Sequence, residues 1–210
     1  MSSVNAPFGL RPAFHPSGLD RAQGLANGIT SGLNVAILKG QPVVYSTAAT
    51  VGSTGAANGT IIPAATPGAS AATAAYSCIG AFAGVEWTDT TGRRRVNNSW
   101  VAGTTFQTGS CVAYFYNDPN IVYEIQADAT LAQTAIGGEY NFSNITAGST
   151  VTGLGQCTLG ASTAQANGAQ GQMRVVDIAQ NVDNAWGDAF TAVRVVLTYP
   201  QINPATTAVV

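Results

Sequence analysis

The stretch Ser77-Cys-Ile-Gly-Ala-Phe-Ala-Gly-Val-Glu-Trp87 is followed by the turn Thr88-Asp-Thr-Thr-Gly92 and the run Arg93-Arg-Arg-Val-Asn-Asn-Ser-Trp100. Further along, Cys111-Val-Ala-Tyr-Phe-Tyr116 and Ile121-Val-Tyr-Glu-Ile-Gln126 flank the turn Asn117-Asp-Pro-Asn120. Apolar runs with period-two alternation, separated by short turns rich in Asp, Asn, Pro, Thr and Gly, are typical of β-hairpins. We therefore predict two successive hairpins within residues 77–128 and interpret them as the folding core.

Alternation within these runs predicts which side chains share a face. In 77–87 the odd positions form one apolar face (Ile79, Ala81, Ala83, Val85, Trp87), and Phe82 belongs to the other. Gly80 and Gly84 predict a close backbone approach or a bulge. After the second hairpin, Asp128 as an N-cap and a later Gly-Gly stop predict one short helix.

Residues 1–32 are predicted to form an extended arm. Pro7, Pro12 and Pro16 are too closely spaced for a helix, and each biases its predecessor toward extended conformations. Apolar residues along this segment, among them Phe8, Leu10 and Phe14, predict that it docks either on its own domain or on a neighbour.

The remaining chain, 33–210, is predicted to be one β domain. Residues 47–76 are dominated by Ala, Gly, Thr, Ser and Pro, which indicates a long loop or insertion. Short alternating runs separated by Gly/Ser/Ala loops continue to Ala192–Tyr199, where Val193, Val195 and Leu197 share a face. Many short strands of this kind favour an all-β fold, a single β-sandwich or barrel, with a jelly roll among the topologies of that class.

The composition excludes several classes of function. Charged residues make up 9% of the 210 residues, against about 25% in ordinary soluble domains. Such a surface suits a protein largely committed to neighbours, and a neutral, stable β protein would have a similar one. The net charge of −2 argues against a general nucleic-acid binder. No apolar run approaches the ~20 residues of a membrane span, and the N-terminus does not have the pattern of a signal peptide.

The residues needed for catalysis are scarce. The single histidine, His15, lies in the arm between Phe14 and Pro16, so a Ser-His-Asp or Cys-His triad is disfavoured. Glu86 and Glu124 are the carboxylates within the predicted strands, and pairing with arginine is their ordinary explanation. Three widely spaced cysteines predict small buried hydrophobes. We therefore expect no enzyme activity, no catalytic or metal site and no cofactor.

One charge cluster stands out, Arg93-Arg94-Arg95. It allows two interpretations: an anchor for acidic groups on a partner protein, or a solvated hairpin that pairs with Glu86 and Asp89. The residues alone leave both open. Three arginines are too few to predict DNA binding.

Several motifs together resemble the head decoration, or cement, proteins of tailed bacteriophages. These motifs are Asn5-Ala-Pro-Phe-Gly-Leu-Arg-Pro12, Gly40-Gln-Pro-Val-Val44, Gly80-Ala-Phe-Ala-Gly-Val-Glu-Trp-Thr-Asp-Thr-Thr-Gly92, Asp118-Pro-Asn-Ile-Val-Tyr-Glu-Ile-Gln126 and Asp183-Asn-Ala-Trp-Gly-Asp188. They follow one another along nearly the whole chain, and none is catalytic.

The resemblance implies a virion protein, made in the host cytoplasm without a signal peptide, on the outer surface of the capsid. It would stabilise the head by bridging neighbouring capsomers, with the major capsid protein and its own homo-dimer or homo-trimer as partners, and with neither nucleic acid nor membrane. The candidate contacts are Phe8, Leu10, Arg11, Phe14, Arg93, Arg94 and Arg95. The alternative is a tail or fibre component with a carbohydrate-binding β domain, in which Trp87, Trp100 or Trp186 stack on sugars.

Overall fold

The computed structural model of the chain describes residues 4–18, 21–46, 55–64, 78–165 and 170–198. Within these residues nearly all regular structure is β, which confirms the predicted all-β class. The helical turns are two short 3-10 segments, η2 (Gln133–Ala135) and η3 (Ala161–Thr163). The helix predicted after Asp128 is therefore wrong. The Asp128 carboxylate instead accepts a hydrogen bond from the distant Ala161 N–H at 2.8 Å.

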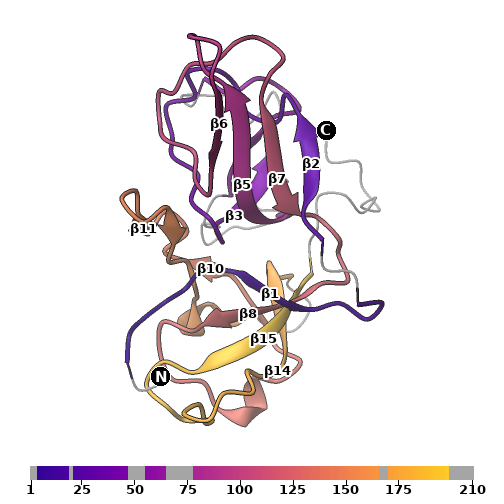
Figure 1. Cartoon of the computed structure of the whole chain (residues 1–210). Helices are drawn as coiled ribbons and strands as arrows, with labels where there is room; N and C mark the ends of the chain where they lie inside the picture. The colour runs from indigo at the N-terminus through magenta and orange to yellow at the C-terminus, as the bar shows by residue number, and fades with distance from the viewer. Residues whose placement is uncertain (1–3, 19–20, 47–54, 65–77, 166–169, 199–210) are drawn as a thin grey trace.

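Two larger antiparallel sheets organise the molecule, one above the other in Figure 1. The first, called the β5 sheet, has the order β2-β7-β5-β3-β4, with β6 also paired to β5. Its strands are β2 (Gln23–Ala26), β3 (Pro42–Tyr45), β4 (Ile61–Pro63), β5 (Gly80–Thr88), β6 (Arg94–Asn97) and β7 (Val112–Tyr116). The predicted hairpin of 77–87 with 93–100 is confirmed as β5 and β6. β4 lies within the predicted loop 47–76, most of which is outside the described residues.

The second sheet, called the β8 sheet, has the order β1-β8-β15-β14-β9. Its strands are β1 (Arg11–Phe14), β8 (Val122–Gln126), β9 (Glu139–Tyr140), β14 (Met173–Ile178) and β15 (Ala192–Leu197). Two small ladders complete the fold: β10 (Phe142–Ser143) with β13 (Thr158–Leu159), and β11 (Gly148–Ser149) with β12 (Leu154–Gly155). Val193, Val195 and Leu197 are buried on one face of β15, as alternation predicts.

The second predicted hairpin is wrong, because its two strands belong to different sheets. β7 pairs with β5 and β2, whereas β8 pairs with β1 and β15. The turn at residues 117–120 closes on itself, since the Asp118 carboxylate accepts the Asn120 N–H at 2.8 Å. A turn of this chemistry reverses the chain without specifying that the flanking strands pair. The pairing is decided by partners that are far away in the sequence.

β5 contains a bulge that changes the predicted faces. β7 pairs Phe115 with Phe82 and Tyr114 with Gly84, so the register shifts by one residue between Phe82 and Gly84. An extra residue reverses the alternation on one side of the bulge. Phe82 therefore shares the buried face with Val85, and its assignment to the opposite face is corrected.

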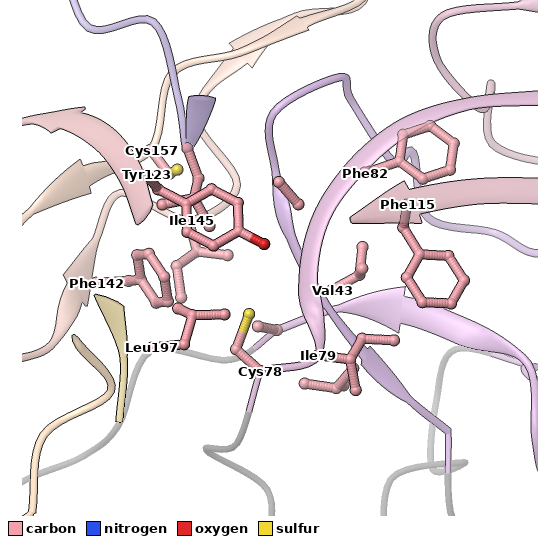
Figure 2. Close-up of a cluster of buried hydrophobic side chains, with 14 of the residues drawn as sticks. Val43, Cys78, Ile79, Phe82, Phe115, Tyr123, Phe142, Ile145, Cys157 and Leu197 are labelled. Atoms are coloured by element: carbon pink, nitrogen blue, oxygen red, sulfur yellow. The ribbon is translucent and has the colours of Figure 1, made fainter. Parts of the chain in front are cut away.

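One buried cluster joins the two sheets. Figure 2 shows Ile79, Phe82 and Phe115 from the part of the core beside the β5 sheet, and Tyr123 and Leu197 from the β8 sheet. The Tyr123 side chain points across the junction, and its hydroxyl donates to the Tyr116 carbonyl at 3.2 Å. The two sheets therefore share a core at the point where the chain crosses between them.

Gly80 makes this crossing possible. It has φ +145°, and a Cβ built on it would lie 1.4 Å from the carbonyl oxygen of Tyr116. No side chain fits there, so the predicted close approach is confirmed. The backbones of β5 and of the end of β7 are in direct contact at this point.

We predict that Gly80→Ala lowers the free energy of unfolding by about 3 kcal/mol or more, because the overlap with Tyr116 forces the backbone apart. Gly92→Ala is the matched control: its φ is +85°, but a Cβ there meets nothing within 4 Å. It should cost only the left-handed backbone penalty of about 1–2 kcal/mol. Urea unfolding followed by tryptophan fluorescence measures both, and equal losses would contradict the close approach as the cause.

Candidate functional site

The predicted arm lies on the chain itself. β1 forms the edge of the β8 sheet and β2 the edge of the β5 sheet, so the N-terminal segment spans both. Leu10 is fully buried in the core and is not available to a partner in this arrangement. The Arg11 guanidinium lies 4.9 Å from the centre of the half-buried Phe8 ring. Of the four predicted arm contacts, Phe14, at 54% exposure, is the one that presents an apolar side chain to solvent.

A carboxylate holds β1 in place. Glu124 on β8 is almost buried, and its oxygens accept from Arg11 at 2.5 Å and from Arg194 at 3.3 Å. Both arginines are register partners of Glu124, so the three side chains form a row across β1, β8 and β15. A charge removed from water needs such partners. The expected pairing of Glu124 with arginine is confirmed.

Gln126, two residues further along β8, binds the start of the arm. Its side-chain oxygen accepts from the Ala6 N–H, and its amide nitrogen donates to the Val4 carbonyl, both at 3.0 Å. This pair of hydrogen bonds satisfies a buried side chain with backbone groups about 120 residues away in sequence. The arm is thus fixed at several points, which the sequence pattern of prolines does not indicate.

His15 lies between a serine and an aspartate. Its Nδ1 accepts from the Ser17 N–H at 3.0 Å and lies 2.7 Å from the Ser17 hydroxyl oxygen. Nε2 lies 3.0 Å from an oxygen of Asp118. The hydrogen bond from the Asn120 N–H lowers the pKa of Asp118, and the nearby His15 lowers this pKa further. Serine, histidine and aspartate, the three residue types of a hydrolase triad, thus meet. Here, however, both the backbone N–H and the hydroxyl of Ser17 contact the same imidazole nitrogen, Nδ1, which is the arrangement of a capped turn. The contact ties the arm to the turn between the sheets.

The Arg93–Arg95 hairpin is organised by Asp89. The Asp89 carboxylate accepts from the Thr91 hydroxyl, the Arg93 N–H and the Arg95 side chain, and these bonds, led by that of Thr91, hold its pKa well below the usual value. Arg94 pairs with Glu86. Arg93 forms no ion pair within the part of the chain that is described. All three arginines remain exposed, so pairing on the hairpin leaves their outer faces accessible.

Two of the three tryptophans, Trp87 and Trp100, form a cluster rather than an open platform, and Trp186 is partly buried against the core. Trp100 is fully buried, and Trp87 and Phe106 contact it edge-on with ring centres 5.8 Å away. Trp87 is half-buried against this cluster, as strand alternation predicts. A ring packed in this way has no free face for a sugar, so Trp100 does not support carbohydrate stacking.

The chemistry-bearing residues elsewhere stay apart. The three cysteines are unpaired and buried, and burial raises the pKa of the Cys78 and Cys157 thiols to about 12 and of Cys111 to about 11. The described residues contain no group of three or more potential metal ligands. No helix in the same part of the chain has the length and apolar character needed to cross a bilayer.

Sequence reasoning missed a group of exposed aliphatic side chains on two hairpins. Val96 lies on β6 and is 73% exposed, and Val101 follows β6 and is 51% exposed. Val151 and Leu154 belong to the β11–β12 hairpin and are 95% and 48% exposed. Alternation does not reveal them, because the β11–β12 hairpin is too short to show a pattern. The two hairpins that carry them are joined by a hydrogen bond between Asn98 and Thr152, which are 54 residues apart in the sequence.

Comparison of the chain with protein-family models, with curated proteins and with solved structures gives no significant match. The resemblance to phage decoration proteins therefore stays a prediction that rests on the quoted motifs.

We predict that Glu124→Gln lowers the free energy of unfolding by about 1–3 kcal/mol, because two arginines lose their charged acceptor. Glu86→Gln is the control, since its pair with Arg94 lies at an exposed hairpin, and it should change stability little. Thermal unfolding compares the two variants. A larger effect of Glu86→Gln would contradict this assignment of the two ion pairs.

We also predict that the three cysteines resist thiol reagents in the folded protein, since the reactive thiolate is suppressed at pH 8 and the sulfur atoms are buried. Unfolding in urea should release all three. Intact mass after timed exposure to iodoacetamide, with and without urea, counts the modified residues. Rapid modification of the folded chain would show that one of these sites opens readily.

Proposed function

We propose that the protein is a capsid decoration protein, which binds the outer surface of the major capsid shell and stabilises the head by bridging capsomers. The observation that carries this proposal is the ordered set of motifs along the chain, from Asn5–Pro12 to Asp183–Asp188. The central motif, Gly80–Gly92, coincides with β5 and its turn, which are the structural centre of the β5 sheet.

The physical character of the chain supports a structural role. The regular secondary structure of its described part is almost entirely antiparallel sheet, and the two larger sheets share a buried core, which favours a rigid body. Charged residues are 9% of the chain, so surfaces can be buried without removing many charges from water. Modest contacts repeated on a symmetric shell add up through multivalent attachment.

The position of the arm changes how bridging is proposed to work. Residues 5–15 are bound by Glu124, Gln126 and Asp118 of the same chain. In this arrangement the arm is part of the rigid body. The shell contact is then made by surfaces that remain exposed after the arm has docked. The predicted contacts that meet this condition are Arg93–Arg95, Phe14 and Arg11, whose side chain stays exposed although it pairs with Glu124.

The test is reconstitution on heads that lack the protein. We expect the purified chain to bind such heads saturably, to add density on the outer surface of the shell, and to raise the temperature at which the heads release DNA. Cosedimentation, electron cryomicroscopy and a DNA-release assay measure these three results. Absence of binding to heads, or density at the tail instead, would refute the proposal, and the tail result would favour the fibre alternative.

A further inference from the structure

Two hairpins that carry exposed apolar side chains contact each other. The first contains β6, and the second contains β11 and β12. The Asn98 side chain donates to the Thr152 carbonyl at 3.1 Å, and Gly153 packs so closely on Asn98 that a Cβ would lie 2.3 Å from its side-chain oxygen. In Figure 1 the β11 hairpin projects from the same side of the molecule as β6. We call this the two-hairpin surface; its exposed apolar members are Val96, Val101, Val151 and Leu154.

The second hairpin is held firmly, so the surface is preformed. The Lys39 N–H donates to the Gly153 carbonyl at 2.9 Å, and the Gly155 N–H donates to the Lys39 carbonyl at 2.8 Å. Ile37, two residues before, bridges to Trp100 at the end of the first hairpin. Clustered exposed apolar side chains of this kind mark interaction sites, whereas single ones are normal.

β6 also offers an unpaired edge. The Asp89 N–H donates to the Arg93 carbonyl, so the peptide groups of Arg93 point toward β5. Because peptide groups alternate in direction along an antiparallel strand, those of Arg95 and Asn97 also point toward β5. The peptide groups of Arg94 and Val96 therefore point to the other side. Among the described residues, β6 pairs with no strand other than β5, and no backbone hydrogen bond from a turn or loop reaches Arg94 or Val96. Such an edge accepts an added strand.

The charge of this region selects the occupant. Arg93, Arg94, Arg95 and Lys39 are basic, and Glu86 and Asp89 are acidic, so the local net charge is +4 − 2 = +2, in a chain of net charge −2. Pairing of two β6 edges would bring two arginine clusters together, which like-charge repulsion disfavours. An extended segment that carries carboxylates satisfies both the charge and the edge.

We propose that the two-hairpin surface docks an extended acidic segment of the major capsid protein, added as a strand to β6. This inference rests on the proposed decoration function and identifies its contact surface. The partner strand pairs with the outward peptide groups of Arg94 and Val96, its carboxylates face the arginines, and its apolar side chains contact Val96 and Val151.

The test uses the full-length chain and heads that lack it. The double variant Val96→Asp/Val151→Asp should bind the heads about tenfold more weakly or worse, as expected when central apolar contacts and charge complementarity are lost together. Val182→Asp is the matched control, because this fully exposed valine lies on the β14–β15 loop outside the surface; it should bind like the unchanged chain. Circular dichroism melting verifies that all three proteins are folded.

Two further variants separate charge from strand addition. Arg93→Glu should weaken binding and reduce its dependence on salt, because Arg93 has no ion pair within the described chain. Val96→Pro removes the outward N–H without touching the β5–β6 ladder, so weakened binding by a folded variant supports strand addition. Binding of Val96→Pro equal to that of the unchanged chain would overturn the added strand.

A photo-crosslinking residue at position 96 identifies the occupant. We expect a crosslink to an acidic segment of the major capsid protein. A crosslink to a second copy of the chain, or equal binding by the double variant and the control, would overturn this inference while the decoration function stands. If the unchanged chain does not bind heads at all, the decoration function itself fails.

Discussion

The contact between Gly80 and the carbonyl of Tyr116 is the constraint on which the fold depends. It allows the end of β7 to press against β5, so the chain can leave one sheet and enter the other within the short 117–120 turn. The Tyr123 hydroxyl then bonds back to the same carbonyl, and its ring fills the core between the sheets. A side chain at position 80 would separate these backbones. The shared core, and with it the rigid body, follows from this one close approach.

The arm depends on the same corner. His15 contacts Asp118 in the crossing turn, and Arg11 and Ala6 bind Glu124 and Gln126 on the strand that follows. These contacts supply hydrogen-bond partners to polar side chains that burial would otherwise leave without any. As a result β1 covers the edge of β8 and β2 covers the edge of β7, while β6 remains an edge strand beside β5. At β6 an unpaired strand edge and exposed aliphatic side chains thus occur together with the cluster of arginines.

Strands with clear alternation and one local hairpin were predictable, and the pairing of strands distant in the sequence was not. The β5–β6 hairpin follows from a short turn between two runs, and the buried face of β15 follows from period two. The bulge near Ala83 reverses a face without any distinct signal except glycine. The 117–120 turn has the composition of a hairpin, yet it joins two sheets. The candidate site divides in the same way: Arg93–Arg95 are visible as a run, whereas Val151 and Leu154 join them only through the contact of Asn98 with Thr152.

The amino-acid sequence by itself determined the all-β class, the low charge and the run of arginines beside a hairpin turn, because these depend on composition and on neighbours within a few residues. Only the tertiary structure decided that β7 and β8 part, that the arm docks on its own chain and that two hairpins share one surface. Those outcomes depend on which buried strand edges and polar groups meet over long separations. Local periodicity carries no information about such meetings, since several pairings satisfy the same alternation equally well.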